Sequence, residues 1–257
     1  MLVYPCGLDV SSRSLSFLAA RLREHHRRIK SRWRRLPVGR QALLVLAHLR
    51  NGTTYAQLAA GFGVGTSTVY RYISEAVDLL AALAPTLDEA VPGLLRRKPY
   101  VLARRGRSSP STGSPPTGLY SGKHKKHGMN VQVIADPFGR LLWASPALPG
   151  AVHDVRAARE HGIINALDQA RIPCWADKGY QGARGTVRVP FRGRWETLST
   201  GQQAVNRSQA KIRALVEQAM ATLKNWRLLR KLRCSTTRIT GLVQAVLTLH
   251  HASSPAG

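Results

Sequence analysis

Acidic residues are scarce in this 257-residue chain: 13 Asp and Glu stand against 39 Lys and Arg, a formal net charge of +26. Such an excess of one sign repels itself, so folding cannot require it. A polyanionic partner explains the charge most simply, and nucleic acid is the commonest polyanion. A chain of this length can bury a substantial core, in one large domain or two small ones.

Long apolar runs are also missing. No stretch approaches the roughly 18 apolar residues that a membrane-spanning helix needs, and the first 20 residues lack the basic start and apolar core of a signal peptide. The three cysteines, Cys6, Cys174 and Cys234, are odd in number and lack metal-ligand spacing. We therefore expect reduced thiols in a soluble, cytoplasmic, nucleoid-associated protein with no membrane partner.

The N-terminal 35 residues combine many basic side chains with apolar residues at helical spacing. Leu15, Leu18, Leu22 and Ile29 follow the helical period, and most of the surrounding positions from Arg21 onward are Arg or Lys. Residues 1–35 are therefore predicted to be a basic amphipathic helix that suits a phosphate backbone. An ordinary solvated face on a leader helix explains the same pattern equally well.

A pair of short helices joined by a glycine-rich turn is expected within residues 36–92. An apolar helix from Val38 to Leu49 precedes a short helix from Tyr55 to Ala60, and Gly61–Gly65 supplies the turn before a helix that begins at Thr66. This order is typical of a helix-turn-helix, whose second helix enters the major groove of DNA.

Four residues near the start of that second helix are the candidate DNA contacts, because its N-terminal residues lie at the base edges. They are Ser67, Thr68, Tyr70 and Arg71. Val69 and Ile73 are expected to face inward. A plain helical hairpin is the alternative, and the net charge favours DNA binding.

Residues 98–250 are expected to form a second domain that contains strands. Its first part, 98–119, begins as a strand and then has the composition of a disordered linker. The sequence 128–145 predicts a hairpin that turns at Asp136–Gly139. A helix from about His153 to Ala170 follows, and residues 251–257 are expected to be a tail.

Two carboxylates stand out in this domain. A short apolar run from Ile172 ends at Asp177, and Glu217 lies on a predicted helix from about Asn206 to Leu232. Arg213 and Lys224 are four residues before and seven after Glu217, so all three share one helix face. Carboxylates in such a setting suit a divalent cation such as Mg²⁺, although a helical salt-bridge ladder explains the spacing on its own.

Several separated motifs resemble one known family in order and spacing. They are Tyr120-Ser-Gly-Lys-His-Lys-Lys-His-Gly, Leu148-Pro-Gly-Ala-Val-His-Asp154, Ala176-Asp-Lys-Gly-Tyr180, and Arg213 followed by Glu217 and Lys224. Together they resemble the bacterial insertion-sequence transposases with a DDE-superfamily endonuclease domain and an N-terminal helix-turn-helix. The resemblance covers about residues 36–250, although Ala210 replaces the tyrosine that often precedes the last motif.

The resemblance implies an α/β fold, an RNase H-like mixed sheet with flanking helices, preceded by the all-α helix-turn-helix domain. It implies transposition of DNA, with Mg²⁺ or Mn²⁺ in a two-metal site. Asp177 and Glu217 correspond to catalytic and metal-ligating residues, and Asp154 matches another acidic position of the family; the alternative for Asp154 is a helix N-cap.

The same resemblance implies partners. These are double-stranded DNA, as terminal inverted repeats and target DNA, and a second copy of the chain in a possible homodimer. The basic residues expected to contact DNA in this domain are Lys123, Lys125, Lys126, Arg213 and Lys224.

The first carboxylate of the family triad is missing. Its place falls in residues 102–106, Leu-Ala-Arg-Arg-Gly, where a cation stands instead of an acid, and no Asp or Glu occurs between Glu89 and Asp136. A local reading-frame slip is our hypothesis for this stretch. We predict impaired catalysis unless Asp136 or Asp154 substitutes; the alternative function is a non-catalytic DNA-binding protein, such as a repressor, and an RNA-binding protein is a third reading.

Overall fold

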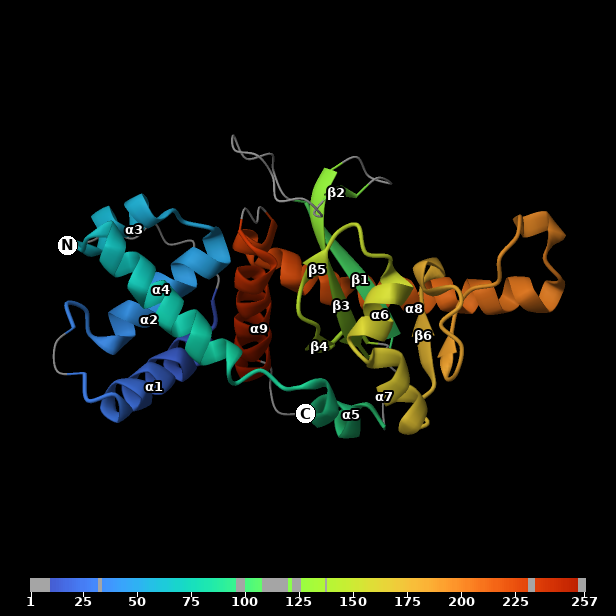
Figure 1. The fold of residues 1–257 in the computed structure, drawn as a ribbon, viewed down its shortest axis with the longest axis horizontal. Coiled ribbons are helices and arrows are strands. Elements are labelled where there is room, and N and C mark those ends of the chain that lie inside the picture. Colours follow the sequence, from blue (N-terminus) through green and yellow to red (C-terminus); the bar gives the residue numbers. More distant parts are fainter. Residues whose placement is uncertain are drawn as a thin grey trace. The chain divides into compact units, whose positions relative to one another are not determined.

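The structure is a computed structural model that describes residues 10–31, 34–95, 100–107, 120–121, 126–136, 138–230 and 234–253. These residues form two compact units, each described here by itself. The helical unit contains α1 to α4 and most of α9, and the mixed-sheet unit contains α5, the described strands, α6, α7 and most of α8 (Figure 1). None of the helices in the described part of the chain is long and apolar enough to span a membrane.

The helical unit is built on four helices from the N-terminal third of the chain. They are α1 (Ser12–Arg28), α2 (Val38–Asn51), α3 (Tyr55–Phe62) and α4 (Thr66–Ala81). Their apolar stripes meet in a core that includes the fully buried Leu18, Leu44 and Leu58. The helix predicted over residues 1–35 extends too far at its C-terminal end, because α1 ends at Arg28. Helix α1 packs as part of the helical unit.

The turn between α3 and α4 has the geometry that a helix-turn-helix needs. Thr54 and Gln57 form a reciprocal capping box at the start of α3. Gly63 ends that helix in the left-handed region, with φ of 65°, where a side chain would be strained. Gly65 then caps α4. The sequence prediction of two helices around this glycine turn is confirmed.

The C-terminal helix α9 (Thr236–Ser253) joins the helical unit from Gly241 onward. The Thr248 hydroxyl donates a hydrogen bond of 2.9 Å to the Leu80 carbonyl oxygen, near the end of α4. Gly241 packs near Val77 of α4: a Cβ added to this glycine would lie 3.5 Å from the Val77 side chain, an ordinary van der Waals contact. The predicted second domain, 98–250, included this helix, whereas its residues from Gly241 onward group with the helical unit. The helix also extends to Ser253, into the predicted tail of residues 251–257.

The mixed-sheet unit has a sheet with both parallel and antiparallel pairs. The long strand β1 (Tyr100–Arg107) pairs antiparallel with β3 (Lys126–Ala135) on one side and parallel with β6 (Cys174–Ala176) on the other. The order β2-β3-β1-β6-β7 ends with β7 (Val187–Arg188), and β2 is Tyr120–Ser121. Two short strands, β4 (Leu141–Ala144) and β5 (Leu148–Pro149), also pair antiparallel with β3.

Strand β1 corrects the disordered-linker prediction for residues 98–119. Residues 100–107 pair with β3 along their whole length, from Tyr100 opposite Ala135 to Arg107 opposite Gly128. A continuous ladder with a long neighbouring strand outweighs a weak local preference for strand. Residues 108–119 lie outside the described part of the chain.

The helices of this unit also differ from the predicted ones. The predicted helix from His153 to Ala170 is two helices, α6 (Asp154–Glu160) and α7 (Ile163–Gln169), because Gly162 takes a left-handed conformation with φ of 70°. Helix α8 (Thr200–Asn225) starts earlier and ends earlier than predicted. The remaining helix, α5 (Leu87–Leu94), is short and begins with a capping box.

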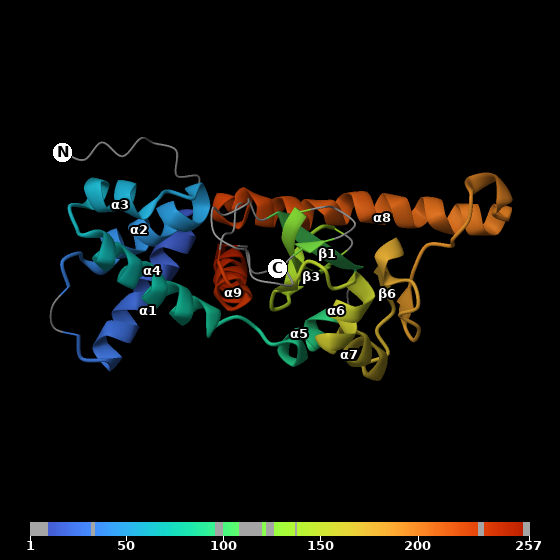
Figure 2. The same ribbon diagram turned by 45° about the horizontal axis from the view of Figure 1, so that its top comes forward.

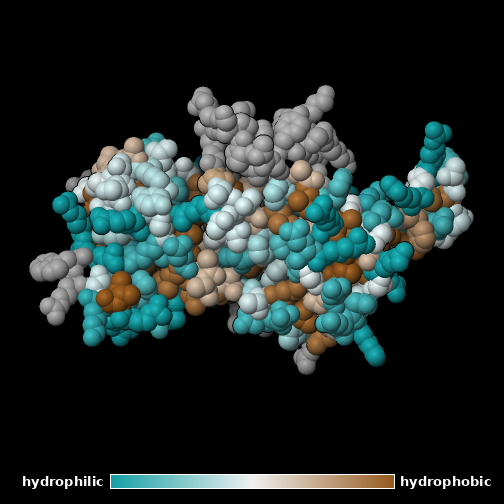
Figure 3. All heavy atoms as spheres, viewed as in Figure 1, coloured by the Kyte–Doolittle hydropathy of each residue, from teal (hydrophilic) through white to brown (hydrophobic). Residues whose placement is uncertain are grey.

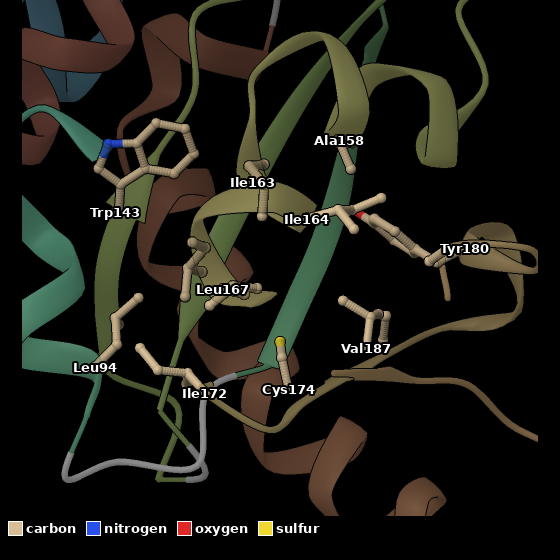
Figure 4. Packing of buried hydrophobic residues seen from close by; sticks show 13 residues of the cluster. Leu94, Trp143, Ala158, Ile163, Ile164, Leu167, Ile172, Cys174, Tyr180 and Val187 are labelled. Atoms are coloured by element: carbon tan, nitrogen blue, oxygen red, sulfur yellow. The ribbon is translucent and has the colours of Figure 1, made fainter. Parts of the chain in front are cut away.

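Helices cover both faces of the sheet. Figures 1 and 2 show α6 and α7 on one face and the long α8 on the other. Between the sheet and the α6–α7 pair lies the core in Figure 4, where Ile163, Leu167 and Cys174 are fully buried together with Tyr180. This packing fixes the ends of β6 and the start of α6, which carry two of the candidate carboxylates.

Candidate active site and DNA-contacting residues

Asp177 directly follows β6 and caps the short 3-10 helix η1 (Lys178–Tyr180). Its Oδ1 accepts a 2.8 Å hydrogen bond from the backbone N–H of Gly179. A carboxylate at the end of a buried strand is held by the sheet behind it. Asp177 is therefore positioned by the sheet itself.

Asp154 is the first residue of α6, and it does not cap that helix. The cap residue is His153, which makes no side-chain capping bond. The carboxylate of Asp154 instead accepts a 2.9 Å hydrogen bond at Oδ1 from the Asn130 side chain. The helix-cap alternative for Asp154 is wrong, because its side chain turns toward the sheet.

The carboxylates of Asp154 and Asp177 converge on Gly179. A Cβ added to this glycine would overlap Oδ2 of Asp154 and would lie 3.0 Å from Oδ1 of Asp177. Only a residue without a side chain lets both acids approach the backbone here. The structure thus brings together two carboxylates from different elements.

A chain of buried polar side chains leads from η1 to Asp154. The Tyr180 hydroxyl donates to Oε1 of Gln132, the Gln132 amide donates to Oδ1 of Asn130 at 2.7 Å, and the Asn130 amide donates to Asp154. Asn130 also donates to the Val152 carbonyl oxygen at 3.0 Å. Asn130 and Gln132 are fully buried, and a satisfied network of this kind fixes one geometry for its members.

Sequence reasoning missed this relay, although a signal was present. Asn130 and Gln132 alternate with apolar residues in a strand that is buried on both faces. Buried polar side chains require hydrogen-bond partners. Two amides inside an otherwise apolar strand could therefore have pointed to a polar partner nearby.

Glu217 is exposed on α8, with a side-chain exposure of 59%, and forms an i,i+4 pair with Arg213 at 3.2 Å. Arg213 and Asp177 line the same cavity, of about 300 Å³, together with Ala210. Helical spacing places Ala210, Arg213 and Glu217 on one face. Glu217 lies about one turn beyond Arg213 along this face and is not among the residues that line the cavity.

The described residues contain no group of three or more His, Cys, Asp or Glu side chains close enough to hold a metal ion. The Asp154 and Asp177 pair still offers the donors that a hard divalent cation prefers, because both acids present carboxylate oxygens at one point. The residues present fit such an ion as part of a site.

Strand β1 lies beside Asp177 but contributes no acid. Val101 stands opposite Ala176 in the parallel ladder, so Leu102 is next in register with Asp177. Residues 100–107 contain no Asp or Glu. The triad position implied by the resemblance therefore falls on a strand that pairs with β6 just before Asp177, but this strand contains no carboxylate.

Asp136 does not replace the missing acid. It belongs to the turn of the hairpin between β3 and β4, where its Oδ1 accepts hydrogen bonds from the backbone N–H groups of Phe138 and Arg140 at 3.0 and 2.9 Å. Its side chain is almost completely buried. The Asp136 carboxylate therefore accepts hydrogen bonds that hold the turn.

The candidate DNA contacts in the helical unit lie at the start of α4. Ser67, Tyr70 and Arg71 are exposed, and Tyr70 is 53% exposed, whereas Thr68 is half-buried. The predicted inward-facing pair, Val69 and Ile73, is fully buried.

The other predicted basic contacts are spread over the chain. Lys224 is exposed near the end of α8, and Arg213 is exposed beside the cavity. Lys126 begins β3, but its side chain is outside the described part of the chain, as are Lys123 and Lys125.

Comparison with known proteins agrees with this geometry. Residues 108–251 match the family model of the DDE superfamily endonucleases, and residues 34–86 match the helix-turn-helix model of the same superfamily. A protein of Streptomyces albus G, assigned as the transposase for insertion sequence element IS112, is 30% identical over 218 residues, which cover 84% of this chain and 80% of the relative. No solved structure matches.

A helix-turn-helix followed in the chain by a DDE-superfamily endonuclease domain defines a DNA-binding protein of the endonuclease class. More particularly, the chain belongs to the insertion-sequence transposases of the DDE-superfamily endonuclease type with an N-terminal helix-turn-helix. DDE-superfamily endonucleases generally use divalent metal ions.

Proposed function

We propose that this protein is a transposase that binds the ends of its own element as double-stranded DNA, and that its strand cleavage and transfer are impaired. The convergence of Asp154 and Asp177 on Gly179 carries this proposal. It supports a site for a divalent cation beside the face of α8 that bears Arg213 and Glu217. We also propose that the mixed sheet is RNase H-like, which the central β1 with an antiparallel β3 and a parallel β6 supports.

The metal ligands in this proposal are Asp177, Asp154 and Glu217. A bound Mg²⁺ or Mn²⁺ would stabilise the negative charge that develops when a DNA phosphodiester is attacked. Arg213 holds the Glu217 carboxylate at 3.2 Å and adds a cation for the DNA backbone. Asn130 donates to Oδ1 of Asp154, and Oδ2 of the same carboxylate lies against Gly179.

The weakness of the proposed site lies in β1. A family carboxylate is absent there, and the sequence of this strand, which pairs with β6 just before Asp177, carries Arg104 and Arg105. A cation repels a metal ion that the remaining acids attract. The family match begins at residue 108, directly after β1, which agrees with an unusual sequence in this strand.

A nicking assay on duplex DNA that carries the element's ends tests this proposal. We expect little Mg²⁺-dependent cleavage by the protein as it stands, and a gain of at least about tenfold in Arg104→Asp, since a ligand returns and a cation leaves. Lys211→Asp, the same change of charge at an exposed position of α8 that does not line the cavity, is the control.

Two results would contradict the proposal. The first is strong cleavage by the unchanged protein, which would mean that the missing acid is not needed. The second is an equal gain in Arg104→Asp and Lys211→Asp. Asp177→Asn in the Arg104→Asp background should abolish the recovered cleavage and leave DNA binding unchanged.

A non-catalytic DNA-binding protein is the second candidate, favoured by the absence of an acid from β1. Such a protein would occupy the element's ends and repress or poison active copies, by itself or as a homodimer. In that case Arg104→Asp would recover no cleavage, while affinity for the inverted repeats would still exceed affinity for unrelated DNA. Size measurement on the complex with two DNA ends would test the homodimer.

A further inference from the structure

The cavity beside Asp177 has three walls from different parts of the mixed-sheet unit. Asp177 and Lys178 form one wall, the segment before α8 supplies Pro190, Gly193, Trp195 and Leu198, and α8 supplies Asn206, Gln209, Ala210 and Arg213. Its volume of about 300 Å³ is at the small end of the range for small-molecule sites. It suits one nucleotide-sized group and not a duplex.

Side-chain hydrogen bonds hold the walls in place. The Asn206 side chain accepts from the Phe191 N–H at 2.9 Å and donates to the Phe191 carbonyl oxygen. The Gln203 amide donates to the carbonyl oxygens of Trp195 and Leu198, at 2.8 and 3.1 Å. The cavity is therefore a built feature and not a chance gap between loops.

Gln209 is the unusual member of the lining. The residue is only 2% exposed, and neither its amide nitrogen nor its amide oxygen has a hydrogen-bond partner within the described part of the chain. Leaving both atoms of a buried amide unpaired destabilises a fold, and native proteins rarely do so. A partner that offers one acceptor and one donor side by side would satisfy it.

The edge of a nucleobase is such a partner. A Gln side chain pairs with adenine through one acceptor and one donor of the base. The rest of the lining agrees with this ligand: Trp195, Pro190 and Leu198 offer apolar surface to the flat base, and Lys178 and Arg213 offer positive charge to its phosphate.

The surroundings carry the charge that a nucleic-acid strand needs. Between residues 181 and 213 the chain has seven Arg and Lys residues and one acid, Glu196. Figure 2 shows the start of α8 extending beyond the sheet together with the segment that precedes it, and the exposed Phe191 and Trp195 lie in that segment. The Arg207 guanidinium carbon lies 5.1 Å from the Trp195 ring centroid, and aromatic rings among cations are typical of surfaces for unpaired bases.

We propose that this cavity receives one unpaired nucleotide of the DNA strand at the cleavage site, with Gln209 paired to its base and Lys178 and Arg213 beside its phosphate. The inference rests on the proposed function, because the DNA strand in the cavity would be the same strand that is cleaved beside Asp177. The base pocket would hold the DNA backbone next to the carboxylates. It assigns a binding role to Gln209, which no sequence motif indicated.

Fluorescence anisotropy on three labelled duplexes of one sequence tests the proposal, in EDTA and at one salt concentration. One duplex is fully paired, one has a single unpaired adenine, and one has an abasic nucleotide at that position. We expect the unpaired adenine to bind about tenfold more tightly than the paired duplex. The abasic duplex should bind with the affinity of the paired one, because a kinked duplex without the base offers no hydrogen-bond partner to the Gln209 amide.

Gln209→Leu should remove the preference for the unpaired adenine and leave affinity for the paired duplex unchanged. Its melting temperature should not fall, because the variant removes an unpaired buried amide. Gln218→Leu, at an exposed position of the same helix, is the control and should behave like the unchanged protein.

Equal affinity for the adenine and abasic duplexes would overturn the inference, as would a preference that survives Gln209→Leu. In both cases binding of the paired duplex would leave the proposed DNA-binding function intact. Failure to bind any of the three duplexes would overturn that function and the inference with it.

Discussion

The buried polar side chains of the two units have different roles. In the helical unit the buried charge centres on one acid, Glu75 on α4, which is bonded by Arg34 at 2.7 Å and Gln41 at 2.9 Å and approached by His25 and His26 at 3.4 Å. This cluster joins three helices and the segment between two of them. Its partners are all internal, so it serves the fold.

The chain of buried polar side chains in the mixed-sheet unit instead ends at a candidate metal-ligating carboxylate. It starts at Tyr180 in the core of Figure 4 and ends at Asp154, whose second oxygen lies against Gly179, as does Oδ1 of Asp177. The visible surface of the molecule mixes hydrophilic residues with scattered hydrophobic ones (Figure 3). The difference indicates that one network fixes how helices pack, whereas the other positions carboxylates.

Removal of Glu75 should give the largest effect on stability. Glu75→Ala leaves Arg34 and two histidines without their acid, and we expect a loss of about 3 kcal/mol in the free energy of unfolding of the helical unit. Thermal unfolding followed by circular dichroism measures it. Glu24→Ala, which removes an exposed pair with Arg21, is the matched control and should cost less than about 1 kcal/mol; equal costs would remove the special role of Glu75.

Removal of Asn130 should act on metal affinity. Asn130→Ala takes the hydrogen bond from Asp154, and we expect Mn²⁺ to bind about 10- to 100-fold more weakly, measured in the Arg104→Asp background. Thr240→Ala is the control, because it removes a hydroxyl that accepts from the Ala147 N–H at 2.9 Å, outside the polar chain that leads to Asp154. If this control weakens Mn²⁺ binding as much as Asn130→Ala does, the relay only stabilises the fold.

Removal of Arg71 should weaken DNA binding about tenfold, because one contact at the start of the second helix is lost. A phosphate contact would also reduce the slope of log affinity against log salt by about one. Arg23→Ala, at an exposed position of α1, is the comparison. An equal loss there would mean that α1 binds DNA as strongly as the helix-turn-helix does.

A change of pH should give the smallest effect. Burial lowers the pKa of His161 in the mixed-sheet unit, against the neighbouring Glu160 charge and a backbone hydrogen bond, which raise it. The unfolded chain then binds the proton first, so stability is complete above the ordinary value of 6.5 and is lost as the pH falls below it. Melting from about pH 7.5 to about pH 5.5 should show a smaller loss in His161→Gln; an unchanged loss would exclude His161 as its source.

The helical unit was predictable because its signals are local. Apolar periodicity, the Thr54 capping residue and the glycines at positions 52 and 63 mark the helix ends within a few residues. The inward positions Val69 and Ile73 follow from the same periodicity. The α9 contacts with α4 did not follow, because they join residues far apart in the chain.

The mixed-sheet unit was predictable only in its parts. The end of β6 at Asp177 and the start of β1 followed from short apolar runs, but the continuation of β1 from Ala103 to Arg107 did not, since it depends on pairing with β3. Nor could the chain order show that Asp154 and Asp177 meet at Gly179 or that Asn130 orients one of them. Such contacts depend on tertiary packing, which a linear pattern does not contain.

The most direct test is a titration with Mn²⁺, followed by electron paramagnetic resonance, of the unchanged protein and of Arg104→Asp. Our account predicts weak binding by the unchanged protein, binding at least about tenfold tighter in Arg104→Asp, and loss of that gain when Asp177→Asn is added. Equally tight binding with and without the restored acid would contradict it.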